Sequence, residues 1–168
     1  MASKGNKKVI EASTKGLSRE AMVIIVKTEW NAPITDKLEA GCKRIFKANG
    51  VKTKTIIVPG AVEIPFAISA YNKSKNETDA FVALACIIKG DTPHFDYVCQ
   101  SITQGITTLN TQLNVPVIYG VLTVNDEQQA IERIGGKHGH KGEEAAITAL
   151  KMIALNRSLP PDTFELPF

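Results

Sequence analysis

The chain has 168 residues, of which 43% are hydrophobic and 22% are charged, and its formal net charge is +3. These values are typical of an ordinary globular protein with one domain and one substantial core. No apolar run approaches the roughly 20 residues of a membrane helix, and no apolar stretch with a cleavage site follows the basic N-terminus, so we expect a cytoplasmic protein without membrane contact.

Residues 1–18 are polar, show no periodicity and carry several lysines. An arginine follows at position 19. A basic arm can indicate a nucleic-acid-binding protein. Because no aromatic residues interleave with these lysines, we interpret the segment as a solvated arm and expect no nucleic-acid partner. Cys42, Cys86 and Cys99 are widely spaced in apolar surroundings, so we expect reduced, buried thiols.

Beyond the arm, continuous apolar runs alternate with segments whose apolar residues repeat every three or four positions. The runs predict strands buried on both faces, and the periodic segments predict helices. The expected strands are 21–27, 55–58, 80–88 and 115–122; the expected helices are one that ends at Asn49-Gly50, 62–72, one with apolar positions from 98 to 113, 127–134 and 142–155.

This alternation predicts right-handed crossovers and a parallel, four-stranded sheet covered by helices on both faces, an α/β fold. Four strands are few for an open sheet, so its edges need cover. The N-terminal segment is available to supply that cover, on its own sheet or on that of a neighbouring copy.

Ligands of open parallel sheets bind beyond the carboxyl ends of the strands, and the unusual residues of this chain fall there. Trp30-Asn31 follow the first expected strand, residues 59–63 the second, and residues 89–94 the third. We place Tyr119 near the end of the fourth, with Asn125-Asp126 beyond it. The sequence therefore predicts that these segments converge on one rim of the sheet.

The segment after the third strand is the most informative. Thr92-Pro93 is typical of the N-cap and first residue of a helix, whose free N–H groups suit a phosphate. His94 would lie in the first turn, where the helix dipole favours a neutral imidazole able to accept a proton. The alternative is a plain capped helix with a surface histidine, and Asp91 argues against a phosphate unless its carboxylate points away.

Other candidates leave two interpretations open. Trp30 is either a core residue or a surface that stacks on a planar heterocycle, and Glu63 either a helix-dipole carboxylate or an acceptor for a polyol. Arg133 and Lys141 flank the glycine-rich stretch 135–142, which fits neither a P-loop nor a Rossmann pattern. That stretch contains His138 and His140, but without nearby cysteines or an acid cluster we expect no metal.

Several ordered segments resemble the signature segments of the lumazine synthases. They are Trp30-Asn31, VPGAVEIP at 58–65, IIKGDTPHFDYVCQ at 87–100, PVIYGVLT at 116–123 and ERIGGKHGHKG at 132–142. The resemblance spans most of residues 20–156. It implies a flavodoxin-like α/β/α sandwich over 19–156, between an N-terminal arm at 1–18 and a C-terminal tail at 157–168.

The resemblance also implies a reaction, the condensation of 5-amino-6-ribitylaminouracil with 3,4-dihydroxy-2-butanone 4-phosphate to 6,7-dimethyl-8-ribityllumazine, phosphate and water, without cofactor or metal. It implies a homopentamer with active sites between neighbouring subunits and, because no insertion separates Arg133 from Lys141, points to members that form sixty-subunit shells. It allows riboflavin synthase as a partner. The alternatives are a non-catalytic flavin-binding or shell-forming scaffold of the same fold, and a flavodoxin-type carrier. The carrier would need a hydroxyl-rich phosphate loop after the first strand. This chain has Thr28-Glu29-Trp30-Asn31 there, with no cluster of Ser, Thr or Gly.

By position, the resemblance implies a role for each site residue. His94 matches the proton-transfer histidine, and Tyr119 matches an aromatic contributed by a neighbouring subunit. The phosphate positions are Asp91, Thr92 and Arg133. The positions for the pyrimidine and its ribityl chain are Trp30, Asn31, Ala61, Val62, Glu63, Cys86, Ile87, Ile88, Tyr119 and Lys141. Some positions depart from the usual pattern of the family. Val62 stands where a larger residue is common, and Trp30 stands where phenylalanine is frequent. The histidines at 138 and 140 also differ from the usual residues.

Overall fold

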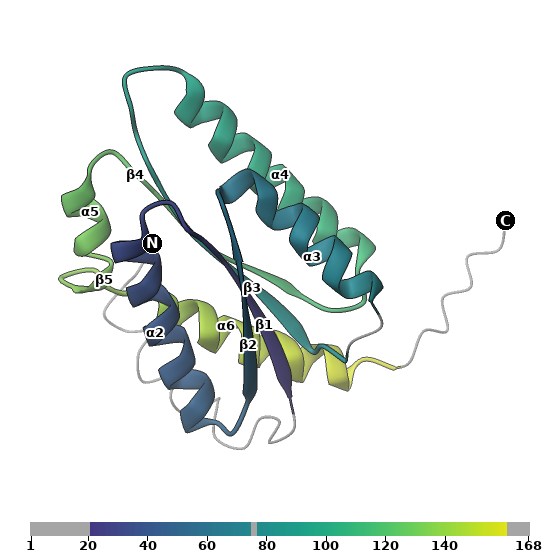
Figure 1. The fold of residues 1–168 in the computed structure, drawn as a ribbon. Coiled ribbons are helices and arrows are strands. Elements are labelled where there is room, and N and C mark those ends of the chain that lie inside the picture. Colours follow the sequence, from purple (N-terminus) through teal and green to yellow (C-terminus); the bar gives the residue numbers. More distant parts are fainter. Residues whose placement is uncertain (1–20, 75–76, 161–168) are drawn as a thin grey trace, which may run out of the picture.

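A computed structural model of the protein describes residues 21–74 and 77–160 and shows a parallel sheet between two layers of helices (Figure 1). The sheet has the strand order β2-β1-β3-β4, and all its pairs are parallel. Its strands are β1 (Met22–Thr28), β2 (Lys52–Val58), β3 (Ala80–Ile88) and β4 (Val117–Val124). The helices are α2 (Ala32–Ala48), η1 (Ala61–Glu63, a single 3₁₀ turn), α3 (Ile64–Lys73), α4 (His94–Gln112), α5 (Glu127–Ile131) and α6 (Lys141–Ser158).

The central strands β1 and β3 are almost wholly buried, as their apolar runs predict. The edge strand β2 is different, because all its residues before Val58 are exposed or half-buried. Its first residues, KTK at 52–54, are polar for this reason, and the sequence therefore placed the start of the strand three residues too late.

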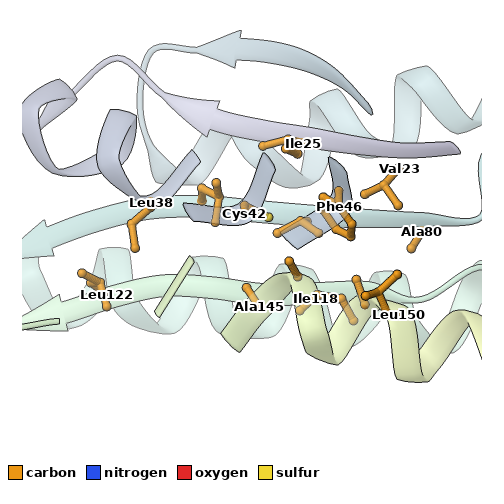
Figure 2. Packing of buried hydrophobic residues seen from close by; sticks show 14 of the residues in the cluster. Val23, Ile25, Leu38, Cys42, Phe46, Ala80, Ile118, Leu122, Ala145 and Leu150 are labelled. Carbon is orange, nitrogen blue, oxygen red and sulfur yellow. The ribbon is translucent and has the colours of Figure 1, made fainter. Parts of the chain in front are cut away.

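Successive side chains of a strand point to opposite faces, and this divides the core in two. Val23 and Ile25 of β1 face α2 and α6, where Leu38, Phe46 and Leu150 complete the cluster drawn in Figure 2. The alternate positions of β1 and β3 face α3 and α4 instead. The residues of this second cluster include Ile24, Val26, Ile64, Ile68, Phe81, Ala83, Ile102 and Ile106. Each central strand thus contributes to both cores.

The helices α2 and α6 cross at a close approach that glycine permits. A Cβ atom at Gly142, in the first turn of α6, would overlap the main-chain carbonyl oxygen of Leu38 in α2. A Cβ atom at Gly41 would overlap the ring of His140, the residue before α6. Both glycines are therefore required by packing between helices, and Gly142 meets backbone that cannot rotate aside.

The bounds of β4 and α5 also differ from the prediction. β4 begins at Val117 and ends at Val124, two residues later than expected, because Pro116 has no N–H group to donate and only its carbonyl pairs with β3, accepting from the amide of Phe81. α5 ends at Ile131 rather than 134. The glycines that follow do not continue it: Gly135 and Gly139 have φ of 118° and 79°, and they shape a small antiparallel hairpin of β5 (Ile134–Gly136) and β6 (Gly139–His140).

The expected α/β fold is confirmed, with the four-stranded parallel sheet and strand order of a flavodoxin-like sandwich. Among the described residues, the outer edges of β2 and β4 have no pairing strand. The proposed N-terminal cover lies outside the described residues, as does the tail beyond position 160. In the part of the chain that the structure describes, no helix is long and apolar enough to cross a membrane.

Candidate active site

The loop after β1 is tied to the end of β3, at the point where the strand order reverses. Asn31 has a left-handed backbone (φ 58°), a conformation that asparagine adopts more readily than most residues. Its side-chain amide donates to the carbonyl of Cys86 at 2.7 Å, and its own carbonyl accepts from the amides of Ile34 and Thr35 in the first turn of α2. Asn31 therefore joins two strands and one helix at the place where open α/β sheets bind ligands.

Trp30 is not a core residue of the described chain. The residue is 66% exposed, which rules out the core interpretation, while stacking on a planar heterocycle stays a prediction. Its main-chain N–H donates to the carbonyl of Pro59, and its ring lies beside Gly60, where a Cβ atom would be 3.2 Å from Cε3 and Cζ3. The loops after β1 and β2 thus hold the indole between them, with one side in contact with the chain and the rest open to solvent.

The turn after β2 carries the next group of candidates. Glu63 accepts a hydrogen bond from the amide of Gly60 through Oε2 at 2.9 Å, so this carboxylate fixes the turn that leads into α3. Ala61 is buried beneath the turn, whereas Val62 is exposed. The turn therefore presents an apolar side chain and one carboxylate on the same rim as Trp30.

The end of β3 forms the base of this rim. Cys86 is buried, and burial raises the pKa of its thiol to about 11, with a smaller contribution from the charge of Glu127. The thiol is therefore protonated at neutral pH and serves as a small apolar group rather than as a nucleophile. Ile87 and Ile88 are half-buried and continue this surface towards solvent.

The helix α4 opens on the rim without a side-chain cap. It begins at His94, and Pro93 occupies the N-cap position, so the prediction that Thr92 caps the helix is wrong. Asp91, Thr92 and His94 are all exposed. The carbonyl of Pro93 accepts from the amides of Asp96 and Tyr97, which leaves the N–H groups before them facing outwards at the positive end of the helix.

Tyr119 does not lie on this rim. It is the third residue of β4, pairs with Ala83, and precedes Val124 at the carboxyl end by five residues, about 16 Å at 3.3 Å per residue. Its predicted place near the end of the strand is therefore wrong. Its hydroxyl lies 3.2 Å from that of Thr103, and burial raises its pKa. Tyr119 and Lys141 instead line an open groove of about 630 Å³ between β4 and α6.

Arg133 and Lys141 are joined by the β5–β6 hairpin. The amide of Lys141 donates to the carbonyl of Arg133 at 2.8 Å, while the Arg133 guanidinium donates to the carbonyl of Gln129. The ammonium of Lys141 lies 2.7 Å from the carboxylate of Glu144. Movement of the hairpin would therefore displace both cations together.

The two histidines of the hairpin have different surroundings. His138 is exposed and lies 3.6 Å from the carboxylate of Glu132. His140 packs on Gly41; its Nδ1 is buried without a hydrogen-bond partner among the described residues, and burial lowers its pKa. Within residues 21–74 and 77–160, no three His, Cys, Asp or Glu side chains gather as a metal-binding group.

One charged cluster beneath the site was not expected from the sequence. Lys27, predicted as the end of an apolar strand, is buried under α2 and lies 2.5 Å from Asp36 and 2.6 Å from Glu39. Glu39 also accepts from Lys43 and from the hydroxyl of Thr55. We call these five residues the Lys27 cluster. The available signal was a lysine in line with the buried β1 positions, five residues before the start of the helix that carries its partners.

Burial acts to raise the pKa of Glu39, but the hydrogen bonds from Lys27, Lys43 and Thr55 outweigh it and lower that pKa to about 2. For Lys27, burial lowers the pKa, and the hydrogen bonds to Asp36 and Glu39 reverse this and raise it. Both groups are therefore charged at neutral pH. The cluster fixes the first turns of α2, directly after Trp30 and Asn31, against β1 and β2.

Comparison with known proteins identifies the same family that the signature segments of the sequence resemble. The model of a family described as 6,7-dimethyl-8-ribityllumazine synthase matches residues 20–157. A protein of that description from Porphyromonas gingivalis is 50% identical over 142 residues, which cover 83% of this chain and 88% of the relative. Another from Bacteroides fragilis is 48% identical over 132 residues, covering 77% of this chain and 92% of the relative. A third, from Parabacteroides distasonis, is 46% identical over 137 residues, covering 80% and 85% respectively.

Proposed function

The chain belongs to the 6,7-dimethyl-8-ribityllumazine synthase family and has lumazine synthase activity in riboflavin biosynthesis, and we propose that the rim described above is where it carries out this reaction. The substrates are 5-amino-6-ribitylaminouracil and 3,4-dihydroxy-2-butanone 4-phosphate. The observation that carries the assignment is that an exposed indole and an open helix N-terminus lie at the same edge of the sheet.

The pyrimidine stacks on the open face of Trp30. Its other contacts are with the apolar base of the rim and with the turn after β2, where Glu63 is held close to the position of a ribityl chain. An aromatic platform beside a planar heterocycle buries a large apolar area and fixes the orientation of the ring. The residues that we assign to this part are Trp30, Asn31, Ala61, Val62, Glu63, Cys86, Ile87 and Ile88.

The phosphate binds at the start of α4. The free N–H groups of the first turn and the hydroxyl of Thr92 are the donors there, and Arg133 supplies a guanidinium. Asp91 is exposed, so its carboxylate has solvent into which it can point away from the phosphate. His94, in the first helical turn, is then close to the carbon atoms that react.

The reaction forms an imine, eliminates phosphate and closes a ring with loss of water, so every step moves protons. Holding two substrates together supplies up to about 7–11 kcal/mol through proximity. A positioned general acid or base adds about 10²–10⁴-fold. We therefore assign the larger share of the rate to the two binding regions and the smaller share to proton transfer by His94.

Tyr119 and Lys141 complete the site of a neighbouring protomer. Within one protomer Tyr119 lies about 16 Å from the carboxyl end of β4, whereas the rim around Trp30 stays open to solvent. A heterologous contact of this kind, repeated around an axis, closes into a ring. We propose the homopentamer as that ring and the sixty-subunit shell as its further assembly.

Mixed oligomers of two variants test this arrangement. Trp30→Ala removes the stacking platform and Tyr119→Ala the residue assigned to the neighbour. If one site takes Trp30 and Tyr119 from different protomers, co-expression of the variants leaves about a quarter of the sites without either change, and product absorbance rises well above that of either variant alone. If activity stays at the level of the single variants, each protomer builds its site alone and the proposal fails.

The remaining assignments concern the setting of the enzyme. We propose that it works in the cytoplasm, which agrees with three free cysteines in the described part of the chain, and that riboflavin synthase is its partner. The catalytic domain is taken as 19–156, between the arm at 1–18 and the tail at 157–168. The helix α6 continues to Ser158, so the first two residues of that tail are helical.

A further inference from the structure

A second hollow lies at the opposite end of the sheet from the rim. It has a volume of about 170 Å³ and is lined by residues at the ends of α4 and α6 and at the start of β4. Figure 1 shows these ends close together at the right. The side chain of Asn156 bridges its two walls by donating to the carbonyl of Asn114 at 2.9 Å. The apolar residues that line it are Leu113, Val115, Pro116, Met152, Leu155 and Leu159.

The walls of this pocket are unusually apolar for a surface that solvent reaches. Leu155 is 51% exposed, Leu159 is 56% exposed, and Met152 is exposed beside them. Apolar side chains gathered around a hollow typically mark a binding site for another apolar group. A cavity of about 150 Å³ lined by apolar residues holds a benzene ring, so this pocket has the size for one phenyl group.

The chain itself provides such a group close by. Leu159 lines the pocket, and the described part of the chain ends one residue later, at Pro160. The next eight residues read PDTFELPF. Phe164 is five residues from Leu159, a reach of at most about 17 Å, which is enough to return to a pocket that begins at Leu159.

The residues between them are suited to a reversal of direction. Proline is favoured at the second position of a β-turn, and the sequence Pro160-Pro161-Asp162-Thr163 offers Pro161 at that position. A turn at this point would direct Phe164 back towards the last turns of α6. Leu166 and Phe168 follow at alternate positions, so in an extended chain they would share the side of Phe164.

We infer that the pocket between the ends of α4 and α6 is a docking site for segment 161–168 of the same chain, with the ring of Phe164 as its occupant. Docking covers Leu155 and Met152 and fastens the chain beyond α6 to the amino end of β4. Burial of a phenyl ring favours the docked form by roughly 10- to 100-fold.

Limited proteolysis with chymotrypsin tests the inference on the intact protein. The protease cuts after Phe164, whereas the bond after Leu166 is protected by Pro167, so loss of residues 165–168 in the mass spectrum reports release of the segment. Leu155→Asp places a charge in the pocket wall at an exposed position and should speed this cleavage about 10-fold or more. Equal rates in the wild type and in Leu155→Asp would overturn the inference.

Ser158→Asp is the matched control, because it adds the same charge to α6, nearer to the segment but outside the pocket lining. It should leave the cleavage rate close to that of the wild type; a rise equal to that of Leu155→Asp would show a general effect of charge and refute docking. Mixed assemblies of wild-type and Leu155→Asp chains, which differ in mass, identify the source of the segment. Cleavage confined to the substituted chains is expected, and cleavage of their wild-type neighbours would show that segments are exchanged between copies.

Discussion

Replacement of Lys27 by methionine should destabilise the protein strongly, although the two side chains have similar length. The Lys27 side chain is only 11% exposed and makes two charge-assisted hydrogen bonds, of 2.5 Å to Asp36 and 2.6 Å to Glu39. Lys27→Met leaves no cavity, so the cost comes from the carboxylates that lose their cation. Glu39 carries most of that cost, because its side chain is 12% exposed whereas that of Asp36 is 61% exposed.

The size of the effect follows from what remains around Glu39. Removal of one partner of a fully buried ion pair costs about 3–5 kcal/mol. Here Lys43 and Thr55 still donate to Glu39, and Asp36 is solvated once it is released. We therefore expect Lys27→Met to lower the free energy of unfolding by about 2–3 kcal/mol. Lys43→Met is the control: its side chain is half exposed, and its pair with Glu39 should contribute less than about 1 kcal/mol.

The assay is urea unfolding at neutral pH and fixed protomer concentration, because the stability of an oligomer depends on concentration. Lys27→Met is combined with Glu39→Leu, which exchanges the buried ion pair for two apolar side chains of similar size. Such an exchange is often neutral or stabilising, so the double variant should recover to within about 1 kcal/mol of the wild type. If Lys27→Met alone costs less than about 0.5 kcal/mol, or if the two losses add, the ion pair does not have the role assigned to it.

The same variant predicts a change in acid stability. The pKa of Glu39 is about 2 in the folded protein, below the value near 4.3 of an unfolded chain, so its contribution is present above that value and is lost as the pH falls towards 2. Lys27→Met removes one of the hydrogen bonds that lower this pKa. The decline of unfolding free energy between about pH 4.5 and 2 should therefore be shallower in the variant, and an unchanged slope would count against the reasoning.

Three other substitutions separate catalysis, binding and packing. His94→Ala should slow turnover by about 10²-fold or more while leaving measurable formation of the lumazine product, and a complete loss of activity in a folded, substrate-binding variant would contradict the ranking of proximity above proton transfer. Arg133→Ala should raise KM for the ketose phosphate about 10-fold with little change in kcat, and an unchanged KM would remove its role in phosphate binding. Gly142→Ala should lower the free energy of unfolding by about 1–3 kcal/mol, because its Cβ atom meets the Leu38 carbonyl, whereas Gly90→Ala, with no atom within 4 Å of its Cβ position, should have little effect on stability.

The comparison of Tyr119 with Trp30 shows where pattern-based inference about the site succeeds and where it fails. Trp30 follows a strand that is buried on both faces, so the end of that strand could be located from the apolar run alone. Tyr119 belongs to a strand whose boundary is set by Pro116 and by pairing with β3. Because β4 ends two residues later than expected, Tyr119 lies five residues before its carboxyl end, and the side chain lines a different groove.

The same limit explains the glycine-rich stretch. From sequence, residues 135–142 are a glycine-rich stretch that fits neither a P-loop nor a Rossmann pattern. In the structure they form a hairpin because Gly135 and Gly139 adopt positive φ, and because His140 fits over Gly41, more than ninety residues earlier in the chain. The residue that His140 packs against, Gly41, lies in helix α2, and no local pattern in the sequence identifies this contact.

The sequence by itself determined the alternation of strands and helices, the two-faced core and the carboxyl rim with Trp30, Glu63 and His94, because burial imposes a periodicity that each segment carries within itself. Tertiary structure alone decided the Lys27 cluster, the crossing at Gly142 and the separation of Tyr119 from the rim. Each of these depends on which distant residues meet in space, and a hydrogen bond or a steric contact between them leaves no periodic signal in either segment.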